Sequence, residues 1–141
     1  MGLIIPSLQD LEKLGWEMRG FRTGRDGIRF GYRKAKGPLD SELSEFRWRQ
    51  DYVEVPAGHA VPRHYHEKRV EGFIVLYGEA TLLTRDLSHF NRPEQTRSLK
   101  KGDTFDVPPR TNHRVENHGD ASLYLLRIAI YDDPKDSVLM E

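Results

Sequence analysis

The fold is decided by one stretch of sequence, residues 58–78, which reads GHAVPRHYHEKRVEGFIVLYG. Two histidines stand two positions apart in it, His64 and His66, and Glu71 follows five positions later. Residues i and i+2 of a β-strand point to the same face of a sheet, whereas on an α-helix they diverge by about 200°. The stretch therefore predicts a strand with both imidazoles on one face, and Glu71 can return from the next strand to complete a metal-binding group.

Length and composition bound the class of protein. The chain has 141 residues, 37% of them hydrophobic, which is enough for one domain with a core. Its 22 Lys and Arg residues balance its 22 Asp and Glu residues, so charge gives no case for nucleic acid or an anionic membrane as the main partner. The absence of cysteine excludes disulfides and cysteine-based zinc sites. No membrane span or signal peptide is visible, so we expect a soluble cytoplasmic protein.

The rest of the chain predicts many short strands and one helix. Ser7 caps an expected helix over residues 7–14. Alternating residues between Gly and Pro turns predict strands over residues 16–23, 28–35, 46–55, 72–84 with a hinge at Gly78, 104–107, 113–116 and 123–131. Residues 86–96 read as a polar loop that is long for a hairpin. This pattern is typical of an all-β barrel or sandwich.

A second ordered set of residues follows the first, with the spacing Gly102, five residues, Pro108, one residue, Arg110, two residues, His113, three residues, Asn117. Together the two sets resemble the two motifs of the cupin superfamily, except that the family usually has glycine at the position of Arg110. The resemblance spans residues 58–117, under half the chain. It implies a single-domain jelly-roll β-barrel over residues 46–141. Residues 1–45 are then an N-terminal helix and strand extension that packs on or between barrels, within one folded domain overall.

In cupins that match both motifs, the metal ligands are the positions occupied here by His64, His66, Glu71 and His113. The chemistry of these residues agrees with that implication. Three imidazoles and one carboxylate suit one divalent transition metal per chain, namely Fe, Mn, Ni, Cu, Co or Zn, and are a poor match for Ca or Mg. Four protein ligands on an octahedral ion leave two positions for a substrate, or for a substrate and O₂.

Strand alternation extends the candidate site. Glu71, Phe73, Val75 and Tyr77 share one expected face, which predicts Phe73 and Val75 as a substrate-binding wall and Glu71 and Tyr77 as candidate catalytic groups. Arg110 is a candidate for binding an anionic substrate, the alternative being an exposed loop arginine. Glycine at this position favours φ > 0, so either the turn differs here or arginine adopts that conformation.

The expected function is that of a metal-dependent enzyme acting on a small polar metabolite, with anionic metabolites among the candidates. Two kinds of reaction are open: a dioxygenase reaction, or isomerase, epimerase or lyase chemistry. The alternative is a non-catalytic module that binds or senses a metal or ligand. The N-terminal hairpin is basic, which would suit nucleic acid. The zero net charge of the whole chain makes nucleic acid a disfavoured partner. Resemblance to small cupins implies a homodimer formed through residues 16–32. His59, His89 and His118, which stand beside turns, are expected in exposed loops.

Overall fold

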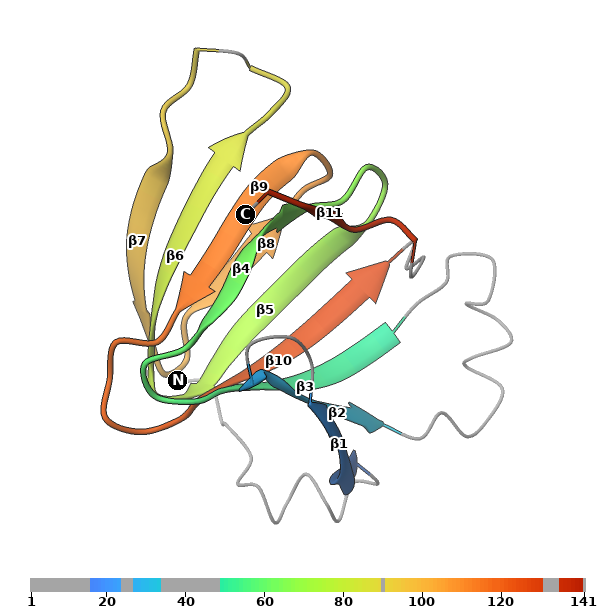
Figure 1. Cartoon of the computed structure of the whole chain (residues 1–141), viewed down its shortest axis with the longest axis vertical. Coiled ribbons are helices and arrows are strands. Elements are labelled where there is room, and N and C mark those ends of the chain that lie inside the picture. Colours follow the sequence, from blue (N-terminus) through green and yellow to red (C-terminus); the bar gives the residue numbers. More distant parts are fainter. Residues whose placement is uncertain (1–15, 24–26, 34–48, 90, 131–134, 141) are drawn as a thin grey trace.

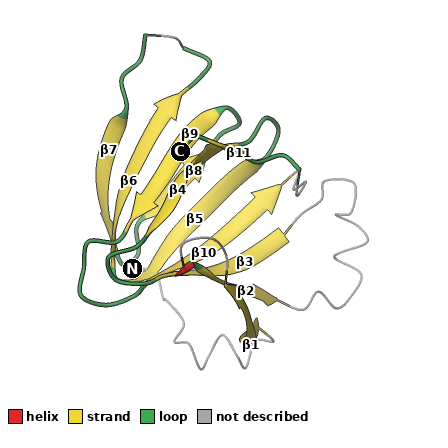
Figure 2. Cartoon of the chain, in the orientation of Figure 1, coloured by secondary structure: helices red, strands yellow, loops and turns green. Residues whose placement is uncertain are grey.

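The computed structural model describes residues 16–23, 27–33, 49–89, 91–130 and 135–140, and within them the chain forms two facing β-sheets (Figure 1). Eleven strands build these sheets, and the described residues contain no α-helix (Figure 2). The strands are β1 Trp16–Thr23, β2 Arg29–Arg33, β3 Arg49–Val55, β4 Ala60–Tyr65, β5 Val70–Tyr77, β6 Glu79–Asp86, β7 Gln95–Lys100, β8 Thr104–Val107, β9 Thr111–Glu116, β10 Leu123–Ile130 and β11 Val138–Leu139. The part of the chain that the structure describes holds no helix long and apolar enough to cross a lipid bilayer.

The strands are arranged as a jelly roll. One sheet has six strands in the order β1-β2-β3-β10-β5-β8, and the other has five in the order β11-β4-β9-β6-β7. Neighbouring strands are antiparallel, and strands distant in sequence, such as β3 and β10, lie side by side. The N-terminal hairpin of β1 and β2 extends the first sheet, because β2 pairs with β3. The all-β, jelly-roll prediction is confirmed.

The core lies between the two sheets because alternate residues of each strand point inward. In β10, residues 123, 125, 127 and 129 are buried while their neighbours are half-buried. Phe73 and Phe105 stack in this core with ring centroids 4.5 Å apart and planes 6° apart. The other large members come from both sheets: Val53, Val55, Val75, Leu82, Leu99, Val107, Val115, Leu123 and Leu125. Each such side chain contributes about 1.5–3 kcal/mol when fully buried.

The two sequence motifs meet at one end of the barrel. The amide N–H of Gly58 donates to the carbonyl of Asn117 at 3.0 Å, and Asn117 N–H donates to the carbonyl of His59 at 3.0 Å. The Asn117 side-chain amide donates to the carbonyls of Val55 and Ala121, both at 2.9 Å. Asn117 therefore ties β3 and β4 to the turn that precedes β10, which explains a buried asparagine there.

Most of the expected strands are present, with ends shifted by a few residues. The hinge at Gly78 separates β5 from β6 as predicted, and the long polar loop is shortened because β7 begins at Gln95. The predicted helix over residues 7–14, and residues 34–35, 46–48 and 131 of the predicted strands, lie outside the described residues. Strands β7 and β11 were not predicted; β7 pairs with β6, and β11 pairs with β4 near the histidines.

Candidate metal centre

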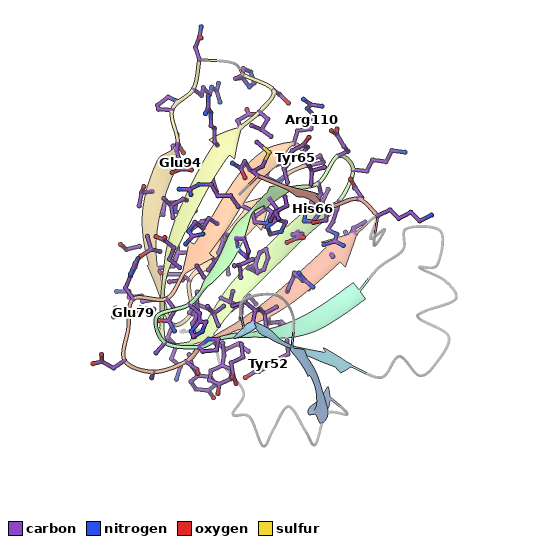
Figure 3. All side chains as sticks on the ribbon, viewed as in Figure 1. Tyr52, Tyr65, His66, Glu79, Glu94 and Arg110 are labelled. Carbon is purple, nitrogen blue, oxygen red and sulfur yellow. The ribbon has the colours of Figure 1, made fainter. Side chains whose placement is uncertain are left out.

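Three histidine side chains converge between the sheets. His64 on β4 lies directly opposite His113 on β9, and His66 follows one residue after the end of β4. The ring centroids are 4.1 Å apart for His64 and His113, 5.0 Å for His64 and His66, and 5.7 Å for His66 and His113. One ring nitrogen from each histidine lies within 4.8 Å of the other two. Figure 3 places His66 near Arg110 and Tyr65, at the end of the barrel opposite Tyr52.

Backbone carbonyls decide which ring nitrogens face the centre. The Nδ1 atoms of His64 and His113 lie 2.8 Å from the Pro62 carbonyl and 3.0 Å from the Thr111 carbonyl, and Nδ1 of His66 contacts the Asp136 carbonyl. A carbonyl can only accept a hydrogen bond, so each Nδ1 carries the proton. In neutral rings the Nε2 lone pairs are then left for another partner, which is the arrangement found around metal-bound histidines.

Glu71 reaches the same centre from the other sheet. It lies on β5, pairs with Ala129 of β10 and Val107 of β8, and is 1% exposed. Its Oε1 lies 2.9 Å from Nε2 of His66, and its Oε2 lies 3.9 Å from Nε2 of His113. Because two bare lone pairs repel each other, the 2.9 Å pair requires positive charge between or beside its atoms, and Arg69 Nη1, 3.0 Å from Oε1 and 3.5 Å from His66 Nε2, is one such charge. Oε2 is buried without a hydrogen-bond partner among the described residues.

Two buried arginines, which were not predicted as site residues, surround the carboxylate. Arg69 Nη1 donates to Glu71 Oε1 at 3.0 Å, and the two side chains are 7% and 1% exposed. Arg127 lies on the inward face of β10, and its charge acts on both Glu71 and His113. The alternation of residues 123–131 could have predicted that Arg127 faces inward, because it places this arginine on the same face as Leu125 and Ala129.

Burial and neighbouring charges shift the pKa values of these groups. Burial, with a smaller contribution from His113, lowers the pKa of His64 to about 3. Burial also lowers the pKa of His113, more than Glu71 raises it. Burial alone would raise the pKa of Glu71, but the hydrogen bond from His66 and the charge of Arg127 hold it well below its ordinary value. At neutral pH the site offers neutral imidazoles at His64 and His113 beside an ionised carboxylate, the protonation states that metal ligands need.

The structure therefore brings together the three histidines predicted as ligands, His64, His66 and His113. Glu71, the fourth predicted ligand, contacts His66 and His113 but lies outside the group whose donor atoms are all within 4.8 Å of one another. Three nitrogen donors and one oxygen donor fit an ion such as Fe, Mn, Ni, Cu, Co or Zn. The buried Glu71 Oε2 without a hydrogen-bond partner is an additional sign, because a metal ion would satisfy it.

A β-bulge separates Tyr77 from this group. Val75 pairs with Leu125, but Tyr77 pairs with Tyr124, so Leu76 is an extra residue that reverses the alternation. The Tyr77 ring meets the Tyr124 ring edge-on, with centroids 6.2 Å apart, and packs in a cluster with Tyr52 and Leu76. The expectation that Tyr77 shares the face of Glu71 is therefore wrong. Phe73 and Val75 do face inward, in the main core.

Arg110 has the backbone conformation that glycine adopts most readily. Its φ is +58°, so the arginine itself adopts the left-handed conformation. Its backbone N–H donates to the His66 carbonyl at 2.7 Å, and its guanidinium pairs with Glu67 at 3.1 Å, both side chains being about half exposed. The backbone of Arg110 thus supports the histidine strand, while its side chain lies at the surface.

The remaining histidines are exposed, as predicted. His59 accompanies the turn before β4, His89 lies 2.6 Å from the Asp86 carboxylate, and His118 lies 3.2 Å from that of Glu116. None of the three is in the cluster formed by His64, His66 and His113.

Comparison with known proteins agrees with this fold. The chain is 36% identical over 72 residues to the uncharacterized protein MJ1618 of Methanocaldococcus jannaschii, spanning 51% of each protein, so it matches about half the length of that curated relative. Among solved structures, the capsular polysaccharide assembling protein CapF from Staphylococcus aureus superposes with a TM-score of 0.69 at 19% identity, over 86% of this chain and 34% of that chain.

Two further structures are similar in fold alone. Drosophila melanogaster CENP-C bound to CAL1 gives a TM-score of 0.63 at 16% identity, over 77% of this chain and 74% of that chain. Oxalate decarboxylase gives a TM-score of 0.63 at 23% identity, over 83% of this chain and 29% of that chain. The protein family described as "Cupin domain" matches residues 51–130. This is more than half of the sequence, and both motifs lie inside the match. The chain therefore belongs to the cupin family.

Proposed function

We propose that this chain is a metal-dependent cupin enzyme acting on a small polar metabolite, with one divalent transition metal held by His64, His66, His113 and Glu71. The observation that carries the proposal is the convergence of three imidazoles whose Nδ1 atoms all face carbonyl oxygens. One ring nitrogen from each histidine lies within 4.8 Å of the other two, and Nε2 of His66 and of His113 face the buried carboxylate of Glu71, one oxygen of which lacks a hydrogen bond among the described residues.

The bound ion supplies Lewis-acid or redox chemistry. The protein supplies a dry site, because His66, His113 and Glu71 are at most 3% exposed. Glu71 is the candidate catalytic residue, since a buried carboxylate can accept a proton from a substrate held beside it. Phe73 and Val75 face inward on the same strand and are the candidate apolar contacts for that substrate.

Metal uptake tests the proposal directly. Chelator-treated protein titrated with Fe(II), Mn, Ni, Cu, Co and Zn is expected to bind one ion per chain. The double substitution His64→Ala/His66→Ala should abolish this binding, whereas His118→Ala, in an exposed loop, should leave it unchanged. Protein that is isolated metal-free and takes up none of these ions would refute the proposed site.

The reaction class needs a separate experiment, because the same nitrogen and oxygen donors hold redox-active and redox-inert ions. A dioxygenase consumes O₂ when the Fe(II)-loaded protein meets its substrate. An isomerase, epimerase or lyase converts its substrate anaerobically, which NMR of the reaction mixture detects. Screening of small hydroxy acids, diols and sugar derivatives under both conditions separates the two classes.

A non-catalytic binding module is the second candidate. The similarity in fold to a CENP-C structure bound to another protein supports it, since that fold also serves protein binding. Saturable binding of a metabolite to the metal-loaded protein, without turnover under air or under nitrogen, would favour the module over the enzyme.

We also propose that Arg110 contributes to binding an anionic substrate at the mouth of the site. Its backbone is hydrogen-bonded to His66, and its guanidinium pairs only across the surface with Glu67 among the contacts described. Arg110→Gly should weaken the binding of an anionic substrate and leave the binding of its neutral analogue unchanged. If the variant and the wild type bind the anionic substrate with equal affinity, Arg110 does not have this role.

Pairing of two chains through residues 16–32 is a further proposal. Strand β1 is the edge of the six-stranded sheet, and an edge strand has unpaired backbone groups that can accept another strand. Light scattering should give the mass of a dimer; a monomer at every concentration tested would refute it.

A further inference from the structure

The C-terminal segment lies against the strand that carries two of the histidines. Strand β11 pairs with β4, with Val138 opposite Tyr65 and Leu139 opposite His64 (Figure 1). Beyond it, the Met140 N–H donates to the Arg63 carbonyl at 2.8 Å. These contacts join residues about 70 positions apart in the sequence, and they lie at the end of the barrel where the histidines converge.

Asp136, two residues before β11, caps the turn between β4 and β5. Its carboxylate accepts three successive backbone hydrogen bonds, from Glu67 at 2.7 Å, Lys68 at 2.9 Å and Arg69 at 3.1 Å. This turn links His66 to Glu71, so its conformation sets how the two side chains approach each other. One carboxylate thus satisfies three N–H groups that the short turn leaves without strand partners.

The backbone of the same residue contacts His66 itself. The Asp136 carbonyl accepts a hydrogen bond from His66 Nδ1, which fixes the proton on that nitrogen and turns Nε2 toward Glu71. The His66 carbonyl is held from the other side by the N–H of Arg110 at 2.7 Å. His66 is therefore fixed through both its ring and its backbone, and Asp136 acts on the ring directly and on the adjoining turn through its carboxylate.

We propose that Asp136 is a positioning residue of the metal centre: its carboxylate and carbonyl together hold His66, Arg69 and Glu71 in the arrangement that binds the ion. This inference rests on the proposed metal site. Residues that orient metal ligands in this way typically contribute 10–100-fold to metal affinity. The carboxylate is the testable part, because a side-chain substitution removes its three hydrogen bonds and leaves the backbone carbonyl in the chain.

The test compares Asp136→Ala and Asp136→Asn with Asp120→Ala as a control. Asp120 is an exposed aspartate in the turn before β10, and it is not a member of the cluster formed by His64, His66 and His113. Full-length proteins are freed of metal and titrated with Co²⁺, whose visible absorption reports coordination geometry, and the affinity is then measured by competition with Zn²⁺. We expect Asp136→Ala to weaken metal binding by about 10–100-fold. Asp136→Asn, which keeps one acceptor oxygen, should fall between Asp136→Ala and the wild-type protein, and Asp120→Ala should match the wild-type protein.

A role in stability alone predicts a different result. In that case Asp136→Ala lowers the melting temperature of the metal-free protein, while the Co²⁺ affinity and spectrum stay those of the wild type; this outcome overturns the proposal. A changed Co²⁺ spectrum with weakened affinity supports it, and Asp136→Asn gives the same reading if the alanine variant does not fold. Wild-type protein that binds no Co²⁺ would instead overturn the metal site itself, so the two failures are distinguishable.

Discussion

The surroundings of His64 disfavour protonation of its ring and leave the ring able to bind a metal ion. Its Nδ1 faces the Pro62 carbonyl and its pKa is lowered to about 3, mainly by burial. Protonating it would place a cation against His113, whose pKa is lowered too. A divalent ion shared by several rings avoids this conflict, since each ring then donates a lone pair to one charge.

Stability of the metal-free protein should fall as the pH falls from about 6.5 toward 3. In this window the unfolded chain protonates His64, whose ordinary pKa is 6.5, while the folded chain does not until about pH 3. Glu71 acts in the same direction at the acidic end, because its folded pKa lies below its ordinary value of 4.5. Each such group contributes a slope of up to about 1.4 kcal/mol per pH unit.

Urea unfolding between pH 7.5 and 4.5 measures this slope. His64→Asn, which has no titrating ring, should give a curve shallower by up to about 1.4 kcal/mol per pH unit than the wild type. His89→Asn, changed in an exposed loop, serves as the control and should follow the wild type far more closely. Identical slopes for His64→Asn and wild type would show that His64 titrates normally.

Removing the charge of Glu71 should lower the free energy of unfolding even in the metal-free protein. Glu71→Gln keeps the shape of the side chain but removes the carboxylate that pairs with Arg69 inside the barrel. Breaking one partner of a buried ion pair typically costs about 3–5 kcal/mol, whereas an exposed pair contributes at most about 1 kcal/mol. We expect a loss of about 3 kcal/mol by chemical denaturation for Glu71→Gln, and under 1 kcal/mol for the exposed Glu67→Gln. Equal effects of the two substitutions would contradict the buried pair.

At the scale of elements, alternation within strands explains why His64 and His66 could be predicted to converge, whereas Glu71 and His113 were identified as ligands by the resemblance to the cupin motifs. Period-2 geometry brings His64 and His66 to one side, and the same rule places Phe73 and Val75 inward. It failed at Tyr77, because one extra residue in β5 places Tyr77 on the other face of the strand from Val75. Gly78, two residues after Leu76, marks the end of the strand and not the bulge within it.

The contacts of the C-terminal segment could not be predicted for a different reason. Residues 135–140 are too few to show a period, and their partners on β4 are far away in sequence. The buried arginines were missed because a charged side chain is normally exposed unless it is paired. The partner of Arg69 is Glu71, which the motif resemblance marks as a metal ligand and not as one half of an ion pair.

Two glycines with positive φ allow a matched test of the turns between strands. A Cβ at Gly78, where φ is +85°, would lie 3.1 Å from the Ser122 carbonyl oxygen and the Leu123 Cα, whereas a Cβ at Gly102, where φ is +91°, would meet nothing within 4 Å. Alanine at either site bears the cost of the left-handed conformation, about 1–2 kcal/mol. Only Gly78→Ala also brings its Cβ too close to backbone atoms, so the chain at Ser122 and Leu123 must move by a few tenths of an ångström.

We therefore expect Gly78→Ala to lose clearly more stability than Gly102→Ala, by about 1–3 kcal/mol in the difference, as measured by thermal or urea unfolding. Losses of the same size at both sites would mean that the chain near Ser122 moves aside without cost. Metal affinity should not change in either variant, because both turns lie at the ends of strands away from the ligand residues.

At the scale of the whole molecule, the proposed ion would connect the two sheets. His64 and His113 stand on the five-stranded sheet, and Glu71 stands on the six-stranded sheet. Global unfolding must separate these sheets, so it must also release the ion. Metal binding should therefore stabilise the entire fold and not merely one loop.

The size of this effect follows from mass action. At a free metal concentration of 100 times Kd, binding to the folded state alone stabilises it by about 2.7 kcal/mol. For a domain of this length that corresponds to a rise of roughly 10 °C in Tm. Differential scanning fluorimetry with increasing Co²⁺ or Zn²⁺ should show Tm rising steadily with the logarithm of the metal concentration. His64→Ala/His66→Ala should show no rise. A wild-type Tm that stays constant while metal demonstrably binds would mean that the ion has similar affinity for the folded and the unfolded chain, which contradicts a site formed only when the two sheets face each other.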